Sequence, residues 1–116
     1  MGRVKGNIEI LGLKKTIRTE AIFDTGSAYT ILSRDLFKQL ELPFFEGKTF
    51  DVELADKRPM KLQAALAYMR LDGCEKPVAV GIMDDPAYPL IVGFLQMEAM
   101  GVKIDPTTKS FTYECK

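Results

Sequence analysis

The 116-residue chain contains 16 basic and 16 acidic residues and no histidine, so its formal net charge at pH 7 is zero. A chain of this length typically forms one domain, here residues 1–116, and its balanced charge indicates neither a nucleic-acid nor a membrane partner. Ser-His-Asp, Cys-His and His-ligated metal centres are excluded, so any hydrolase chemistry must use carboxylates or lysines.

The first predicted element is a β-hairpin. Apolar and polar side chains alternate over residues 4–11 and again over residues 16–23, and residues 12–15 between them suit a turn. The second strand of this hairpin runs directly into Asp24.

A short strand and a helix are expected next. Residues 29–32 are β-prone, and Ser33 is a suitable N-cap for a helix over residues 34–40. Pro43 marks the end of this helical segment.

The middle of the chain predicts a long hairpin with a charged tip. A strand pattern over residues 50–54 breaks at residues 56–59, and a β-compatible run resumes over residues 60–71.

The last third of the chain predicts more strands and a second helix. Residues 94–100 can form two helical turns that stop at Gly101. The strand before Gly93 is wholly apolar, which indicates burial on both faces. The further expected strands are residues 77–82, 90–92, 102–105 and 110–114. The total is about seven to nine strands with one or two short helices, an all-β domain.

One turn carries a pattern suited to acid–base chemistry. Asp24-Thr25-Gly26-Ser27 places a carboxylate directly after an apolar strand, followed by a glycine and flanked by two hydroxyls. Two carboxylates that share one proton can deprotonate water and protonate a carbonyl oxygen, so they can hydrolyse a peptide bond without metal or cofactor. One Asp24 is insufficient, but two related by a dimer two-fold axis would suffice.

The alternative is an ordinary turn, because Asp-Thr-Gly occurs by chance in roughly one or two of every hundred chains of this length. Three features favour an active site. An apolar strand precedes the motif, a second apolar strand that ends in Gly93 follows later, and a hairpin of lid size lies between them.

With these motifs in this order, the sequence resembles the retropepsin family of retroviral and related single-domain aspartic proteases. The resemblance covers about residues 5–113 and is carried by residues 23–32, 90–93 and 101–105. It implies a closed β-barrel-like acid protease fold, a homodimer with its active site on the two-fold axis, and a flap from each subunit over a peptide or unfolded protein substrate.

The resemblance also implies roles for the catalytic turn. Asp24 would activate and share the attacking water with its dimer mate. Thr25 would point its hydroxyl across the two-fold axis, and Gly26 would let the substrate backbone approach. Ser27 is expected to donate to the Asp24 carboxylate, which would make the pH optimum more acidic than that of an alanine variant.

The segment Ile91, Val92 and Gly93 matches the family's apolar-apolar-Gly motif, which supports the catalytic turn from behind. Phe94 and Leu95 depart from the family pattern, in which a basic residue and an Asp or Asn commonly follow this glycine. This departure puts the retroviral form of the dimer interface in doubt.

By position, the flap spans residues 52–66, and its tip lies near Asp56, Lys57, Arg58 and Pro59, followed by Met60. The tip lacks the glycines of retroviral flaps, so we expect a stiffer and more charged lid. Alternatively, Lys57 and Arg58 are simply a solvated turn. The expected pocket walls are Ile22, Ile31 and Ile82.

Three functions fit the sequence: an endopeptidase active as a homodimer, a retropepsin-like dimerisation or peptide-binding module with negligible turnover, and a protease that acts only on its own precursor. The intact Asp-Thr-Gly-Ser motif favours catalysis.

Cys74 and Cys115 have no metal-binding spacing and are expected to be unpaired thiols. Residues 1–7 lack the apolar core of a secretory signal, and no apolar run is long enough to span a membrane, so we expect a cytoplasmic protein.

Overall fold

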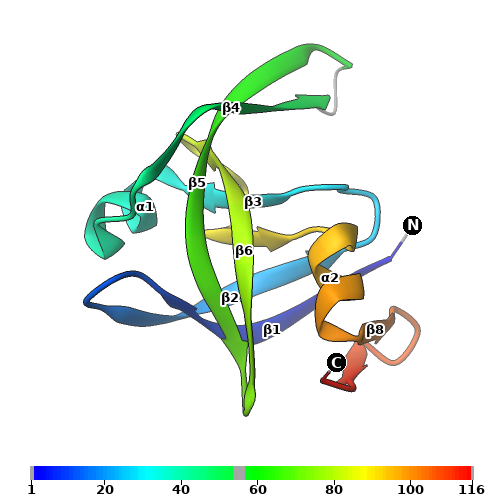
Figure 1. Ribbon diagram of the computed structural model, residues 1–116. Helices are drawn as coiled ribbons and strands as arrows, with labels where there is room; N and C mark the ends of the chain where they lie inside the picture. The colour runs from blue at the N-terminus through cyan, green and yellow to red at the C-terminus, as the bar shows by residue number, and fades with distance from the viewer. Residues whose placement is uncertain (1, 54–56, 116) are drawn as a thin grey trace.

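The computed structural model describes residues 2–53 and 57–115, and this part of the chain forms nine strands and two short helices (Figure 1). In chain order the elements are β1 (Arg3–Leu11), β2 (Thr16–Asp24), β3 (Thr30–Ser33), α1 (Arg34–Leu40), β4 (Phe44–Glu53), β5 (Pro59–Leu71), β6 (Cys74–Met83), β7 (Leu90–Val92), α2 (Phe94–Met100), β8 (Val102–Asp105) and β9 (Ser110–Tyr113).

Six of the strands close into a mixed β-barrel. Their order is β1-β2-β7-β3-β6-β5, and pairing between β1 and β5 closes the circle. β7 is parallel to β2, and β3 is parallel to β6, whereas the other barrel pairs are antiparallel. This arrangement confirms the predicted all-β, barrel-like acid protease fold with two short helices.

The first hairpin fixes the position of Asp24. β1 and β2 pair without interruption from Leu11 opposite Thr16 to Arg3 opposite Asp24, and the predicted turn is closed by a bond from Gly12 N–H to the Lys15 carbonyl (2.8 Å). Alternate side chains of β1 are buried inside the barrel, as expected for a strand with one face toward the core. The hairpin therefore delivers Asp24 to the end of a strand that is fixed on both sides.

Both helices have the predicted bounds, and Ser33 and Gly101 cap them as expected. The Leu36 N–H donates to Ser33 Oγ (3.2 Å) at the start of α1. α1 ends at Leu40, because Glu41 adopts a left-handed conformation with φ of 52°. Gly101, with φ of 68°, ends α2 in the same way.

The core fills the barrel and the space under the two helices. Residues from every barrel strand contribute to it, together with one side of each helix. The largest fully buried side chains are Ile8, Ile10, Phe23, Leu32, Leu40, Met69, Cys74, Val80, Leu90, Val92 and Met100. None of the helices in the described ranges is long and apolar enough to cross a membrane.

The two cysteines form a disulfide, so the prediction of unpaired thiols is wrong. Cys74 begins β6, and Cys115 follows β9, 41 residues later, with a Cα–Cα distance of 5.4 Å. Close to this bond, Tyr113 at the end of β9 donates its hydroxyl to Asp72 in the β5–β6 turn, so the end of β9 lies beside that turn. The spacing of the two cysteines in the sequence could not predict this bond, because they meet only when the end of β9 packs beside the β5–β6 turn.

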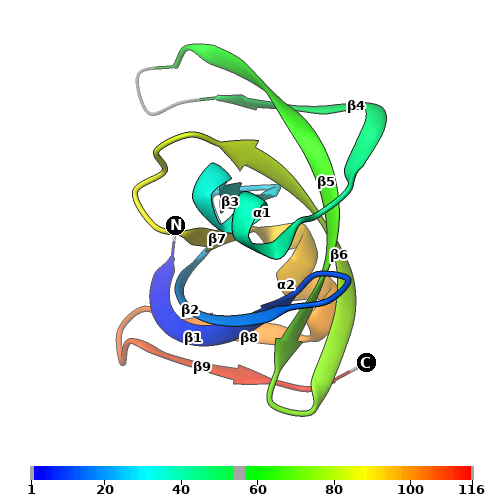
Figure 2. The ribbon, with the colours of Figure 1, turned by 90° about the vertical axis from the view of Figure 1, so that its left-hand side faces the viewer.

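The β4–β5 hairpin extends from the barrel as an arm, visible in green in both ribbon views (Figures 1 and 2). β4 begins earlier than predicted, at Phe44, and a bulge interrupts its pairing with β5 between Phe44 and Thr49. Gly47 lies in this bulge with φ of 75°, a conformation that glycine adopts without strain.

Candidate active site

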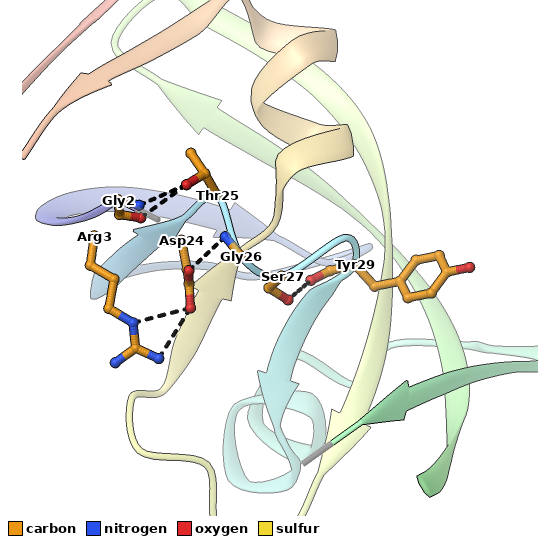
Figure 3. A network of polar contacts seen from close by, with 7 residues as sticks. All are labelled: Gly2, Arg3, Asp24, Thr25, Gly26, Ser27 and Tyr29. Carbon is orange, nitrogen blue, oxygen red and sulfur yellow. Dashed lines mark hydrogen bonds and ion pairs between the residues drawn. The ribbon is translucent and has the colours of Figure 1, made fainter. Parts of the chain in front are cut away.

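Asp24 is the last residue of β2 and is almost entirely buried, with 6% of its surface exposed. Its Oδ1 accepts a hydrogen bond from the Gly26 N–H (2.9 Å), and its carbonyl accepts one from the Ser27 N–H (3.1 Å). Figure 3 shows the resulting turn. The turn thus holds the carboxylate in one orientation before any substrate binds, as an acid–base centre requires.

Arg3 is a contact of Asp24 that sequence reasoning missed. Its Nε and Nη2 lie 3.2 and 3.1 Å from Asp24 Oδ2, so one guanidinium edge covers this oxygen (Figure 3). The pair follows from the hairpin register, since Arg3 is the residue directly opposite Asp24. Counting outward from the Gly12–Lys15 turn could have found it.

Thr25 contacts the start of β1 within the same subunit. Its Oγ1 accepts a bond from the Gly2 N–H (2.8 Å) and donates to the Gly2 carbonyl (3.4 Å), and its own N–H donates to that carbonyl (3.0 Å). The role expected for this hydroxyl, a bond across a dimer two-fold axis, stays a prediction.

Ser27 does not donate to the Asp24 carboxylate, which corrects the expected interaction. Its Oγ donates instead to the Tyr29 carbonyl (2.7 Å; Figure 3). The backbone bends toward β3 after Gly26, so the Ser27 side chain stabilises this bend, and Gly26 N–H and Arg3 supply the donors to Asp24. The predicted acidic shift of the pH optimum by Ser27 loses its structural basis.

The apolar strand β7 lies between the two strands that flank the catalytic turn. It pairs with β2 (Ile22 with Ile91, Phe23 with Val92) and with β3 (Ile31 with Ile91). Both edges of β7 are thus occupied, and β7 fixes the spacing of the strands on either side of Asp24.

Gly93, directly after β7, lies against the backbone that follows the catalytic turn. A Cβ atom at Gly93 would be only 2.3 Å from the Tyr29 carbonyl oxygen, so no other residue fits without movement. The Gly93 N–H donates to the buried Thr30 hydroxyl (3.1 Å).

The first turn of α2 extends this support. The N–H groups of Phe94 and Leu95 donate to the carbonyls of Ser27 (2.7 Å) and Ala28 (3.2 Å). These two residues are 45% and 57% exposed, so they present apolar surface at the start of α2.

A cleft of about 670 Å³ opens over the turn. Its walls come from the catalytic turn and from the strand β4. The turn and the strands behind it contribute Ile31 and Ile91, the segment after β6 contributes Met83, Pro86 and Ala87, and β4 contributes Asp51, Val52 and Glu53. Arg3 and Asp24 both line it. This volume suits part of an extended peptide.

The residues predicted for the flap and the pockets are only partly found at this cleft. The β5 side of the hairpin holds Lys57, Arg58, Pro59 and Met60, and none of these residues lines the cleft. The hairpin residues that line it come from the described part of β4. Asp56 lies outside the described residues. Ile31 lines the cleft as expected, whereas Ile22 and Ile82 are buried and do not line it, and Ile82 packs in the hydrophobic core instead. Among residues 2–53 and 57–115, no group of His, Cys, Asp or Glu could hold a metal ion.

A closed six-stranded barrel with an Asp-Thr-Gly turn and an apolar strand behind it defines a retropepsin-like aspartic protease fold. A model of the family described as aspartyl protease matches residues 4–105. The chain therefore belongs to the aspartyl protease family. No curated relative matches the sequence.

Solved structures from several organisms have a similar fold. The retroviral protease-like domain of Ddi1 from Leishmania major is similar over 98% of this chain and 90% of that chain, with a TM-score of 0.62 and 16% identity. A retropepsin-like aspartic protease from Rickettsia conorii is similar over 90% and 85% of the two chains (TM-score 0.51, 17% identity). Lpg0085 from Legionella pneumophila, of unknown function, is similar over 79% and 83% (TM-score 0.51, 15% identity). At these identities the likeness shows the fold alone.

Proposed function

We propose that this protein is an aspartic endopeptidase that is active as a homodimer. The observation that supports this proposal most directly is the Asp24 carboxylate, which the Gly26 N–H holds at a strand end in the floor of a peptide-sized cleft. Membership of the aspartyl protease family supports the same reaction.

In the proposed mechanism, two Asp24 carboxylates from two subunits lie about 3 Å apart and share one proton. The ionised Asp24 takes a proton from water as the water oxygen attacks the peptide carbonyl carbon. The protonated Asp24 gives its proton to the carbonyl oxygen, which yields a tetrahedral diol. Proton transfer to the amide nitrogen then lets the C–N bond break, so one carboxylic acid and one amine leave.

The proposed substrate is an extended peptide or an unfolded protein segment. A peptide between the catalytic turn and the flap strand β4 can make main-chain hydrogen bonds, while alternate side chains enter pockets. Ile31, Val52 and Ile91 supply apolar surface in the cleft, so we propose a preference for apolar side chains next to the scissile bond.

The test is cleavage of an unstructured protein over about pH 3 to 7 by the wild type and by the Asp24→Asn variant, with and without a statine-type transition-state mimic. We expect cleavage by the wild type, its inhibition by the mimic, and a loss of at least about a thousandfold in the variant. Equal cleavage by the two proteins would rule out the mechanism.

A second candidate function is a dimerisation or peptide-binding module with weak turnover. The pairing of Arg3 with Asp24 favours it, because this carboxylate is covered in the single subunit. Peptide binding by a well-formed dimer, without cleavage at any pH in the same experiment, would support this candidate.

The proposed cytoplasmic location stays a prediction. The Cys74–Cys115 disulfide bears on it, because disulfides persist mainly in oxidising compartments. Alkylation of free thiols in intact cells, followed by mass analysis of the protein, would decide whether this bond exists where the protein works.

A further inference from the structure

Gly2 and Arg3, at the N-terminal end of β1, contact the polar groups of the catalytic turn. Gly2 engages the Thr25 hydroxyl and N–H, and the Arg3 guanidinium engages Asp24 Oδ2 through two nitrogens (Figure 3). The Arg3 side chain is 62% exposed, whereas that of Asp24 is 8% exposed. Arg3 therefore lies on the solvent side of the pair and covers the carboxylate.

The covered groups are those that the proposed reaction needs. Arg3 and Asp24 line the same cleft, so the guanidinium contacts the carboxylate from the side where substrate and water would enter. It lies 3.1–3.2 Å from Oδ2, and the second carboxylate of an active pair must come about equally close to the first. Both groups cannot occupy the same side of Asp24 at once.

We propose that Gly2 and Arg3 form a latch that covers the catalytic turn in the single subunit, and that assembly of the active dimer displaces Arg3 from Asp24. This inference rests on the proposed function and adds a means of regulation to it. In a subunit released from the dimer by dilution, Arg3 would pair with Asp24 again.

The exposure of Arg3 makes such a latch reversible. An ion pair with one largely exposed partner contributes little to stability. Its contribution corresponds to a change of up to about fivefold in the equilibrium constant between the closed and the open latch. A dimer opens two latches, so removing both should tighten dimerisation by up to about 25-fold. The Gly2 contacts hold the strand start in place and do not depend on the Arg3 charge.

The first test measures access to Asp24 in the dilute single subunit. An amine is coupled to carboxylates with a water-soluble carbodiimide, and labelling of Asp24 is followed by peptide mass mapping in the wild type, in Arg3→Gln and in Arg18→Gln. Arg18 is an exposed residue on the neighbouring strand β2, so its variant removes the same charge without touching Asp24. We expect labelling of Asp24 to be up to about fivefold faster in Arg3→Gln alone. Equal or slower labelling would overturn the latch.

The second test measures assembly by sedimentation of the same three proteins over a range of concentrations. We expect Arg3→Gln to dimerise more tightly than the wild type and Arg18→Gln to match the wild type. A dimer of unchanged or weaker affinity in Arg3→Gln would overturn the link between assembly and latch opening. Cleavage assays on the same samples keep the two proposals apart, because absence of turnover in all three contradicts the proposed function, while labelling and sedimentation still decide the latch.

Discussion

Gly93 lies where the chain after β7 crosses the backbone that leads out of the catalytic turn. Because a Cβ there would be 2.3 Å from the Tyr29 carbonyl oxygen, Gly93→Ala must push these two segments apart. We expect a loss of about 1–3 kcal/mol in the free energy of unfolding, measured by urea denaturation, and lower peptidase activity.

The matched control for this prediction is Gly73→Ala in the β5–β6 turn. A Cβ at Gly73 has no neighbour within 4 Å, so this variant should unfold much like the wild type. If both variants had the same stability, the close packing of Gly93 would not be the reason for glycine at this position.

Single residues of the site could be predicted where a local motif specifies them. Asp24 and Gly93 stand out because one follows an apolar strand in an Asp-Thr-Gly motif and the other ends a second apolar strand. The predicted hydrogen-bond partner of Ser27 was wrong, because the direction of its hydroxyl depends on how the backbone bends toward Tyr29. The contact of Arg3 was missed because it depends on strand register, and Arg3–Asp24 is the ninth pair counted from the turn.

At the scale of elements, helices were predicted to the residue because their signals are local. Ser33 caps α1, and Gly101 ends α2, as each sequence pattern indicates. The start of β4 was misjudged because its first half pairs with β5 across a bulge, which breaks the alternation that identifies a strand. The disulfide was missed because β9 meets the β5–β6 turn only in the folded chain.

The disulfide should stabilise the protein by restricting the unfolded chain. Closing a loop of 41 residues corresponds to about 4 kcal/mol in the chain-entropy model. We therefore expect Cys115→Ser to lower the free energy of unfolding by about 2–4 kcal/mol in chemical denaturation. Reducing agent should lower the free energy of unfolding of the wild type to that of Cys115→Ser and leave that of Cys115→Ser unchanged. An equal effect on both proteins would show that the disulfide is not the source of the difference.

The ion pair between β1 and β5 should make stability depend on pH. Arg70 donates to both Glu9 carboxylate oxygens (3.0 and 3.1 Å), and these hydrogen bonds lower the pKa of Glu9. A lowered pKa stabilises the fold above the unfolded-state pKa of Glu9, and this stability is lost as pH falls through the folded-state pKa.

Glu9→Gln should therefore be less stable than the wild type at pH 7, and the difference should shrink as pH falls below the unfolded-state pKa of Glu9 and vanish below its lowered folded-state pKa. Thermal unfolding at a series of pH values measures this difference. Glu20→Gln, on an exposed position of β2, is the control for loss of one negative charge. A wild-type advantage that persisted unchanged in acid would show that the Glu9 charge is not its source.

At the level of the whole molecule, the described residues combine one Asp-Thr-Gly turn, the β4–β5 hairpin and a cleft lined by both. The sequence predicted this architecture, because a retropepsin-like barrel follows from two motifs in order and a hairpin between them. It could not predict how the cleft is lined, since Asp51, Val52 and Glu53 face it only through the path of β4. Assembly also lies beyond the sequence pattern, because Phe94 and Leu95 replace the residues that commonly follow the glycine in this family.

If each chain carries half of the catalytic centre, a chain without the Asp24 carboxylate should inactivate the chain that it pairs with. The most direct measurement holds the wild type at a fixed concentration and adds a rising excess of Asp24→Asn protein while peptide cleavage is followed. We expect activity to fall toward zero as wild-type chains are drawn into mixed dimers with a single carboxylate. Activity that stays constant, while sedimentation shows that mixed dimers have formed, would show that one Asp24 is sufficient for cleavage.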